Sequence, residues 1–116
     1  MKIYLVCSVR NCTVEQQMEA DTYVATMESN GHQVHYPPRD VNQNDPTGGI
    51  QICKAHRAAI EACDEVHILW DGNSKGSHFD LGMAWALRKQ VKLVNKNFPD
   101  VTGKSYLKVI QGWDIS

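Results

Sequence analysis

The sequence predicts an α/β protein: a Rossmann-like or flavodoxin-like three-layer sandwich built on a parallel sheet. Short, apolar, β-rich runs alternate with segments of helical pattern from the first residues to the last, and this alternation is typical of parallel βαβ units. The chain has 116 residues, of which 42% are hydrophobic and 22% are charged. This size and composition predict one globular domain over residues 1–116.

The first strand is expected at residues 2–7, an apolar run of β-forming residues. A helix follows, with Thr13 as its N-cap and Gln16 completing a capping box, and it ends at Asn30-Gly31. Its apolar residues at helical spacing are Val14, Met18, Tyr23, Val24 and Met27. A second strand is expected at residues 33–36, because Pro37-Pro38 must end it.

Residues 37–48 show no periodicity and predict a long loop, which is either a binding loop or a simple connection. A second helix is expected at residues 49–63, with Ile52, His56 and Ile60 on one face.

The third strand is expected at residues 65–70 and is followed by a loop of small residues. Ser77 is expected to begin the third helix, with Asp80 at the capping-box position. The apolar stripe expected for that helix is Phe79, Met83 and Leu87. A fourth strand at residues 91–95 and a last short helix at about residues 103–112 complete the chain.

Right-handed crossovers with one reversal predict a sheet of four or five strands in the order 2-1-3-4. Ligands of such sheets bind beyond the carboxyl ends of the strands, where the strand order reverses. The expected cleft therefore lies between the first and third strands, where residues 8–12 and 71–77 meet.

Charge and composition disfavour several classes of function. Lys and Arg number 12 against 13 Asp and Glu, a formal net charge of −1, so the basic excess typical of nucleic-acid binding is missing. No apolar run approaches the roughly 20 residues that cross a bilayer, and no membrane partner is expected. The four cysteines form no CxxC pair, which favours reduced thiols and a cytoplasmic location. His32 and His35 have HxxH spacing but no second ligand pair, so neither zinc nor a cofactor is expected.

Residues 71–77 carry glycine, serine and lysine between a strand and a helix. Such a loop suits a phosphate or a sugar, because its backbone N–H groups can approach a ligand at the positive end of the helix. Ser74, Gly76 and Ser77 are expected to bind there, and Asp71 could accept a hydrogen bond from a ribose hydroxyl. The loop matches neither GxxxxGK[ST] nor GxGxxG, and an ordinary strand-to-helix turn is the alternative.

Four other residues are candidates on the walls of the expected cleft. Arg10 could clamp a phosphate or be a surface arginine, and the Tyr4 hydroxyl could orient a carboxylate. Asp80 could attack a carbon electrophile or serve only as a helix cap. His56 interrupts the apolar face of its helix and could be a base, a ribose contact or a packing residue.

Two segments, IYLVCSVRN and CDEVHILWDGNSKGSHFDLGMAWAL, resemble the nucleoside 2-deoxyribosyltransferase superfamily, and within it the deoxynucleoside 5′-monophosphate N-glycosidases. The resemblance implies that a carboxylate attacks the anomeric carbon and expels the base. Water, in the hydrolases, or a second base, in the transferases, then resolves the glycosyl-enzyme. It also implies a homodimer or a larger homo-oligomer, because small proteins of this family complete their sites across subunits.

The resemblance assigns roles to several residues. Asp80 would be the nucleophile, because residues 76–82 match the family's G-x-x-E-L-G type segment with one extra residue before the acid. Tyr4 matches the strand tyrosine of the family. The residues implied in phosphate binding are Ser8, Val9 and Arg10 with the adjoining Asn11, and Ser74, six residues before the acid.

The sequence departs from the family pattern at two positions. The acid is Asp80 rather than glutamate, one methylene shorter, and His56 stands where the family carries an aspartate that helps handle the proton of the base. The histidine could protonate the leaving base, or it could mean a changed substrate or lost chemistry.

The sequence thus supports an enzyme that cleaves the N-glycosidic bond of a nucleotide or nucleoside. The alternative is a non-catalytic nucleotide-binding module of the same fold. A flavodoxin-like domain binding FMN is a third reading, and the absence of a Ser/Thr-rich phosphate loop after the first strand argues against it.

Overall fold

A four-stranded parallel sheet in the order β2-β1-β3-β4 forms the centre of the molecule, as the sequence predicts. The computed structural model describes residues 1–10, 12–95, 98 and 103–114. The strands are β1 Lys2–Val6, β2 Gln33–His35, β3 Glu65–Ile68 and β4 Gln90–Leu93. Tyr4 of β1 pairs in register with His35 of β2 and with Val66 of β3.

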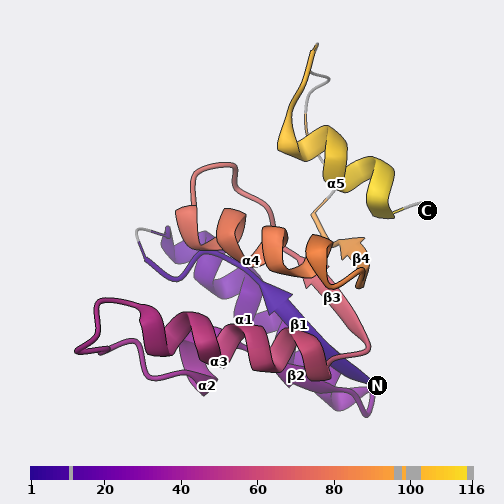
Figure 1. The fold of residues 1–116 in the computed structure, drawn as a ribbon. Helices are drawn as coiled ribbons and strands as arrows, with labels where there is room; N and C mark the ends of the chain where they lie inside the picture. The colour runs from indigo at the N-terminus through magenta and orange to yellow at the C-terminus, as the bar shows by residue number, and fades with distance from the viewer. Residues whose placement is uncertain (11, 96–97, 99–102, 115–116) are drawn as a thin grey trace.

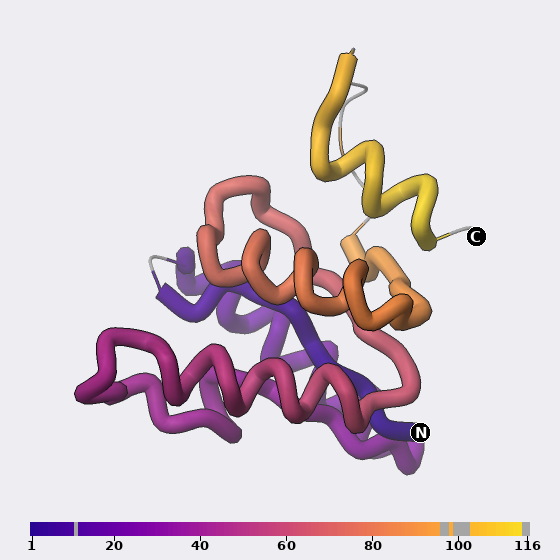
Figure 2. The backbone as a smooth tube through the Cα atoms, in the orientation of Figure 1, coloured from indigo at the N-terminus to yellow at the C-terminus, as the bar shows by residue number. Residues whose placement is uncertain are grey.

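Helices cover both faces of the sheet (Figure 1). They are α1 Val14–Ser29, α2 Pro37–Asp40, α3 Ile50–Ala62, α4 Lys75–Ala86 and α5 Tyr106–Asp114. In Figure 1, α3 and α4 lie in front of the strands and α1 lies behind them. The last helix, α5, stands beyond the edge strand β4, and the segment joining β3 to α4 arches away from the sheet (Figure 2).

The central strand β1 supplies side chains to both hydrophobic cores, as the alternation of a strand requires. Tyr4 and Val6 belong to the core that contains residues of α3, α4 and α5. Ile3, Leu5 and Cys7 belong to the core that contains residues of α1. The side chains of β1 are therefore divided between two cores, and Tyr4 lies in the one that contains residues of α3 and α4.

The first helix has the predicted capping box, in which Thr13 and Gln16 exchange hydrogen bonds. Its predicted apolar stripe is wrong in the first turns, where Val14 and Met18 are 70% and 62% exposed. Sixteen helical residues span about 24 Å, whereas the five residues of β1 span about 17 Å. The helix is thus longer than the strand it covers, and the residues buried along it are Ala20 and Val24.

Residues 37–48 are not wholly a loop, because Pro37–Asp40 form the short helix α2. Proline is favoured at the first position of a helix, where its missing N–H costs nothing. The Asp45 carboxylate then accepts hydrogen bonds from the N–H groups of Thr47, Gly49 and Ile52. Hydrogen bonds from Thr47 are the main reason that the pKa of Asp45 is lowered to about 2. This turn leads the chain into α3.

The fourth helix begins at Lys75 because its N-cap is Ser74, three residues before the expected N-cap Ser77. The Ser74 hydroxyl accepts a hydrogen bond from the Ser77 N–H at 3.1 Å. Asp80 therefore lies in the second turn, and the prediction that it is a capping-box acid is wrong. The predicted stripe is wrong at Phe79 and Leu87, which are 58% and 38% exposed, whereas Met83 is partly buried and packs against the core. The residues that α4 buries are Ser77, Asp80, Leu81 and Ala84.

Three further features concern the part of the chain that the structure describes. Its helices include none that is long and apolar enough to cross a membrane. All four cysteines are free thiols. Within the same residues, no group of three or more His, Cys, Asp or Glu side chains could hold a metal ion.

Candidate active site

Asp80 is the centre of a buried polar cluster between the sheet and two helices. The residue is 5% exposed, and the Tyr4 hydroxyl donates a hydrogen bond to its Oδ2 at 2.9 Å. His56 Nδ1 lies 3.1 Å from Asp80 Oδ1. The structure thus brings together the three residues expected to be catalytic, from β1, α3 and α4, and both carboxylate oxygens have a partner.

The two aromatic neighbours of Tyr4 fix how the cluster is arranged. The ring of His35, the register partner of Tyr4 on β2, stacks on the Tyr4 ring with centroids 5.3 Å apart and an angle of 13°. The His56 ring meets Tyr4 edge-on, at 6.0 Å and 66°. His56 and Ile60 are the buried residues of α3, so the packing of this helix holds the imidazole against Asp80.

Burial determines the protonation of the Tyr4 phenol. Desolvation, the largest cause, and the neighbouring Asp80 carboxylate together raise the pKa of Tyr4 well above its usual range. The same two causes raise the pKa of the Cys7 thiol to about 12. Tyr4 therefore keeps its proton and remains a hydrogen-bond donor to Asp80 at physiological pH.

Three buried side-chain atoms have no partner among the residues that the structure describes, namely His35 Nε2, His56 Nε2 and Ser77 Oγ. The last two belong to residues of α3 and α4, and Ser77 is only 2% exposed. Ser77 and Asp80 lie three residues apart on the buried face of α4. Because buried polar groups are nearly always paired, these two atoms mark places where a ligand or water could supply the missing hydrogen bond.

Several polar groups of the loop before α4 form hydrogen bonds within the loop. Asp71 Oδ1 accepts hydrogen bonds from the N–H groups of Asn73 and Ser74, and the Ser74 hydroxyl caps α4. A Cβ atom added to Gly76 would meet nothing closer than Ser74 Oγ, at 3.9 Å. The loop is thus held in shape by Asp71, and the backbone beside Gly76 stays accessible.

The turn after β1 lies at the same edge of the sheet, because β1 and β3 are parallel neighbours. The Ser8 hydroxyl donates to the Arg10 carbonyl at 3.0 Å, and Arg10 is exposed while Val9 is half-buried. Asn11 lies outside the described residues. The two expected cleft loops therefore follow adjacent strand ends, as the fold prediction requires.

Sequence reasoning missed the part that His35 plays in this cluster. It considered His35 only as one half of an HxxH pair, whereas the structure stacks the residue on Tyr4. The signal was the alternation of β2, which buries Val34 toward α1 and so turns His35 to the other face. Registering β2 against β1 would have placed this imidazole beside Tyr4.

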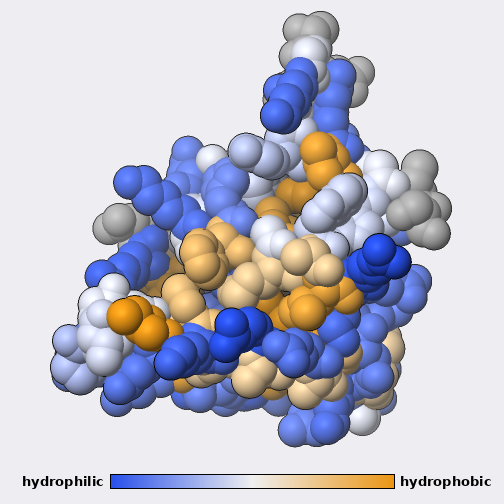
Figure 3. Space-filling view, viewed as in Figure 1, coloured by the Kyte–Doolittle hydropathy of each residue, from blue (hydrophilic) through white to orange (hydrophobic). Residues whose placement is uncertain are grey.

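A separate apolar cavity of about 370 Å³ lies between α4 and α5. In Figure 3 apolar surface gathers along α4 and at the base of α5. His78, Gly82 and Trp85 line it from α4, whereas Asp80 lies on the buried face of that helix. The Trp85 ring meets Trp113 edge-on at 5.0 Å, and Trp70 packs against His78 at 4.8 Å. This cavity is distinct from the expected cleft.

Comparison with known proteins identifies the family. Residues 3–111 match the family model described as "Nucleoside 2-deoxyribosyltransferase". The chain belongs to the nucleoside 2-deoxyribosyltransferase family. Nucleoside 2-deoxyribosyltransferases and their relatives are glycosyl transferases or hydrolases that act on nucleosides or nucleotides, so membership identifies the protein as an enzyme.

Two solved structures share the fold of this nucleoside 2-deoxyribosyltransferase family member. A 2-deoxyribosyltransferase from Bacillus psychrosaccharolyticus has 21% sequence identity and a TM-score of 0.67, over 80% of this chain and 71% of that one. The CMP N-glycosidase BcmB from Clostridium botulinum has 23% identity and a TM-score of 0.58, over 80% and 67%. No curated protein sequence matches this chain.

Proposed function

We propose that the protein cleaves the N-glycosidic bond of a nucleotide or nucleoside, with Asp80 as the nucleophile. The observation that supports this most directly is the buried carboxylate of Asp80, held through both oxygens by Tyr4 and His56. Membership of the nucleoside 2-deoxyribosyltransferase family supports the class of reaction. The names of the two similar structures, a deoxyribosyltransferase and a CMP N-glycosidase, support transfer and hydrolysis as its two forms.

The reaction needs a carboxylate at this place. Breaking the bond between C1′ and the base nitrogen builds positive charge on the sugar, which a nearby carboxylate stabilises. An Asp80 oxygen then bonds to C1′ while the bonding electron pair leaves with the base. Water or a second base displaces Asp80 from C1′ in the next step.

Tyr4 is proposed as the residue that orients the nucleophile. Its raised pKa keeps the hydroxyl protonated, so it donates to Oδ2 throughout the reaction without competing for the sugar. The stacked His35 ring on one side and the edge-on His56 ring on the other hold the phenol in place. Such positioning supplies a large part of the barrier reduction in group transfer.

The remaining candidates are proposed to hold the sugar and a 5′-phosphate. The amino end of α4 favours an anion, and the unpartnered Ser77 hydroxyl lies in the first turn of that helix. Asp71 is proposed to accept from a ribose hydroxyl. The residues proposed to bind the substrate or its phosphate are Ser8, Val9, Arg10, Asn11, Ser74, Gly76 and Ser77, with Ser8, Arg10 and Ser74 holding the phosphate.

Two further proposals concern the oligomeric state of the protein and its location in the cell. We propose a homodimer or larger homo-oligomer, supported by the exposed Phe79 and Trp85 side chains on the outer side of α4. A cytoplasmic location is supported by the four free thiols.

The decisive experiment measures base release. Purified protein is incubated with ribo- and deoxyribonucleosides and their 5′-monophosphates, with and without an acceptor base, and free base is followed by chromatography. We expect release by the wild type and by the control variant Glu61→Ala, an exposed acidic residue of α3, and none by Asp80→Ala. A nucleotide that binds without being cleaved would overturn the proposal in favour of the binding module.

A further inference from the structure

We propose that His56 Nε2 is the group that gives a proton to the leaving base and later takes one from the attacking water. This inference rests on the proposed function. It selects one of the three meanings that the sequence leaves open for a histidine at this position.

The contacts of the His56 ring leave one nitrogen for this role. Nδ1 faces Asp80 Oδ1 at 3.1 Å, and the edge-on packing against Tyr4 fixes the plane of the ring. Nε2 is buried, yet no polar atom of the described residues pairs with it. An imidazole held by a carboxylate through Nδ1 presents Nε2 for proton transfer, the arrangement that orients histidine in many hydrolases.

The other groups around Asp80 are poor proton donors to a departing base. The Tyr4 hydroxyl is engaged with Asp80 Oδ2, and its raised pKa disfavours loss of the proton. An aliphatic hydroxyl such as that of Ser77 does not ionise in the physiological range. His35 Nε2 is also buried without a partner, but His35 stacks on Tyr4 from the β2 side. Among these groups, His56 alone combines contact with Asp80 and a titratable nitrogen without a partner.

His56 alone can carry out both proton transfers of the reaction, one to the base and one from water. When both ring nitrogens are protonated, Nε2 donates its proton to the base nitrogen as the bond from that nitrogen to C1′ breaks and Asp80 bonds to C1′. The neutral ring then accepts a proton at Nε2 from water, whose oxygen bonds to C1′ and releases Asp80. His56 ends the cycle protonated, and the products are the free base and the free sugar.

The test compares two leaving groups that differ in their need for a proton. One substrate is the nucleotide or nucleoside that the base-release panel identifies, and the other is the 4-nitrophenyl glycoside of the same sugar. Nitrophenolate departs without protonation, so a lost general acid costs little with this substrate. His56→Asn keeps an N–H donor near Asp80 and removes Nε2, and His35→Asn is the matched control on the other side of the Tyr4 ring.

We expect His56→Asn to lose about 100-fold or more in kcat on the natural substrate and less than about 10-fold on the nitrophenyl glycoside. His35→Asn should change the ratio of the two rates by less than about threefold, on the order of a local packing change. Equal losses by His56→Asn on both substrates, or no loss on either, would overturn the role of His56 and leave the proposed function standing. A wild type that is inert on both substrates would overturn the proposed function as well.

Discussion

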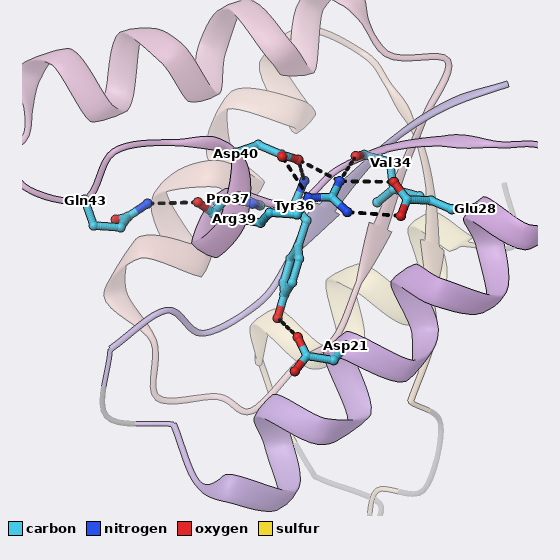
Figure 4. Close-up of polar contacts among 8 residues, drawn as sticks. All are labelled: Asp21, Glu28, Val34, Tyr36, Pro37, Arg39, Asp40 and Gln43. Carbon is cyan, nitrogen blue, oxygen red and sulfur yellow. Dashed lines mark hydrogen bonds and ion pairs between the residues drawn. The ribbon is translucent and has the colours of Figure 1, made fainter.

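Two polar networks of this protein differ in how completely their atoms are paired. Figure 4 shows the Arg39 network, in which the guanidinium of Arg39 binds both carboxylate oxygens of Glu28, the Asp40 carboxylate and the Val34 carbonyl. It ties α1, β2 and α2 together at the surface. The Asp80 network joins β1, α3 and α4 in the interior, and there His56 Nε2 and Ser77 Oγ have no partner in the described chain.

The difference matters for stability, because unpaired buried atoms destabilise a fold. A polar atom buried without a partner costs about 1–3 kcal/mol of folding free energy. The Arg39 network avoids this cost, because its groups are paired and the Arg39 side chain is 45% exposed. The Asp80 network carries it at two atoms beside a carboxylate. Destabilising features of this kind are expected where function, rather than stability, requires the residue.

The largest expected effect comes from removing the hydroxyl that orients Asp80. Tyr4→Phe should lower kcat for base release by about 100- to 1000-fold, the usual loss for one donor to a reacting group. The matched control is Tyr23→Phe, because the Tyr23 hydroxyl hydrogen-bonds His67 away from the Asp80 network. Steady-state kinetics of both variants checks this. Equal rates for Tyr4→Phe and Tyr23→Phe would show that the Asp80 network needs no orientation by Tyr4.

Breaking the Arg39 network should affect stability and leave catalysis unchanged. Arg39→Ala should lower the free energy of unfolding by about 1 kcal/mol, since its pairs are half-exposed and screened by solvent. Urea unfolding measures this, with Arg57→Ala, an exposed arginine of α3, expected to stay within about 0.5 kcal/mol of wild type. A fall in kcat for Arg39→Ala with unchanged stability would reverse the assignment of the two networks.

Ser77→Ala tests whether an unpaired atom of the Asp80 network serves function, because the variant should be more stable but should bind substrate less well. Removing a buried hydroxyl without a partner should raise the free energy of unfolding by up to about 1 kcal/mol. The KM for a 5′-monophosphate should rise several-fold if the hydroxyl binds the substrate. Urea unfolding and kinetics of the same preparation check both. Lower stability with an unchanged KM would mean that the hydroxyl is a structural group.

Acid should destabilise the two regions in different pH windows, and this is the smallest effect. Burial lowers the pKa of His35, so stability falls as pH drops below the ordinary histidine value of about 6.5, where the unfolded chain binds the extra proton. The hydrogen bond from Arg39 lowers the pKa of Asp40, so its contribution is lost as pH falls below about 4. The free energy of unfolding is measured from pH 7 to 3. The fall in stability below about pH 6.5 should be absent in His35→Asn, and the fall below about pH 4 should be absent in Arg39→Ala. Unchanged curves in both variants would contradict this assignment.

The sequence predicts those features that depend on one local rule. Alternation in β1 divides Tyr4 from Ile3, the Thr13 capping box begins α1, and strand and helix order give the sheet topology. The approach of Tyr4 to Asp80 also follows, because an inward strand residue and a helix residue of the next layer share one core.

The errors arise where two local rules compete. Ser74 and Ser77 are both good N-caps, and the choice of Ser74 depends on the Asp71 carboxylate holding the preceding turn. That three-residue difference moves Asp80 from the capping-box position to the second turn of α4, where it is buried. The position of His35 beside Tyr4 depends on strand register, which no short segment of sequence contains.

The sequence separation within the Asp80 network also determines when it forms. Tyr4 and Asp80 lie 76 residues apart, and His56 lies 24 residues before Asp80. Contacts of such long range must overcome the entropy of closing a long loop, so they form after most of the chain has collapsed. During synthesis Tyr4 emerges 76 residues before Asp80, so its phenol lacks this partner until α4 is made. The Asp80 carboxylate therefore meets Tyr4 and His56 only when β1, α3 and α4 have all been made and packed together, and chains that stop short of α4 should release no base.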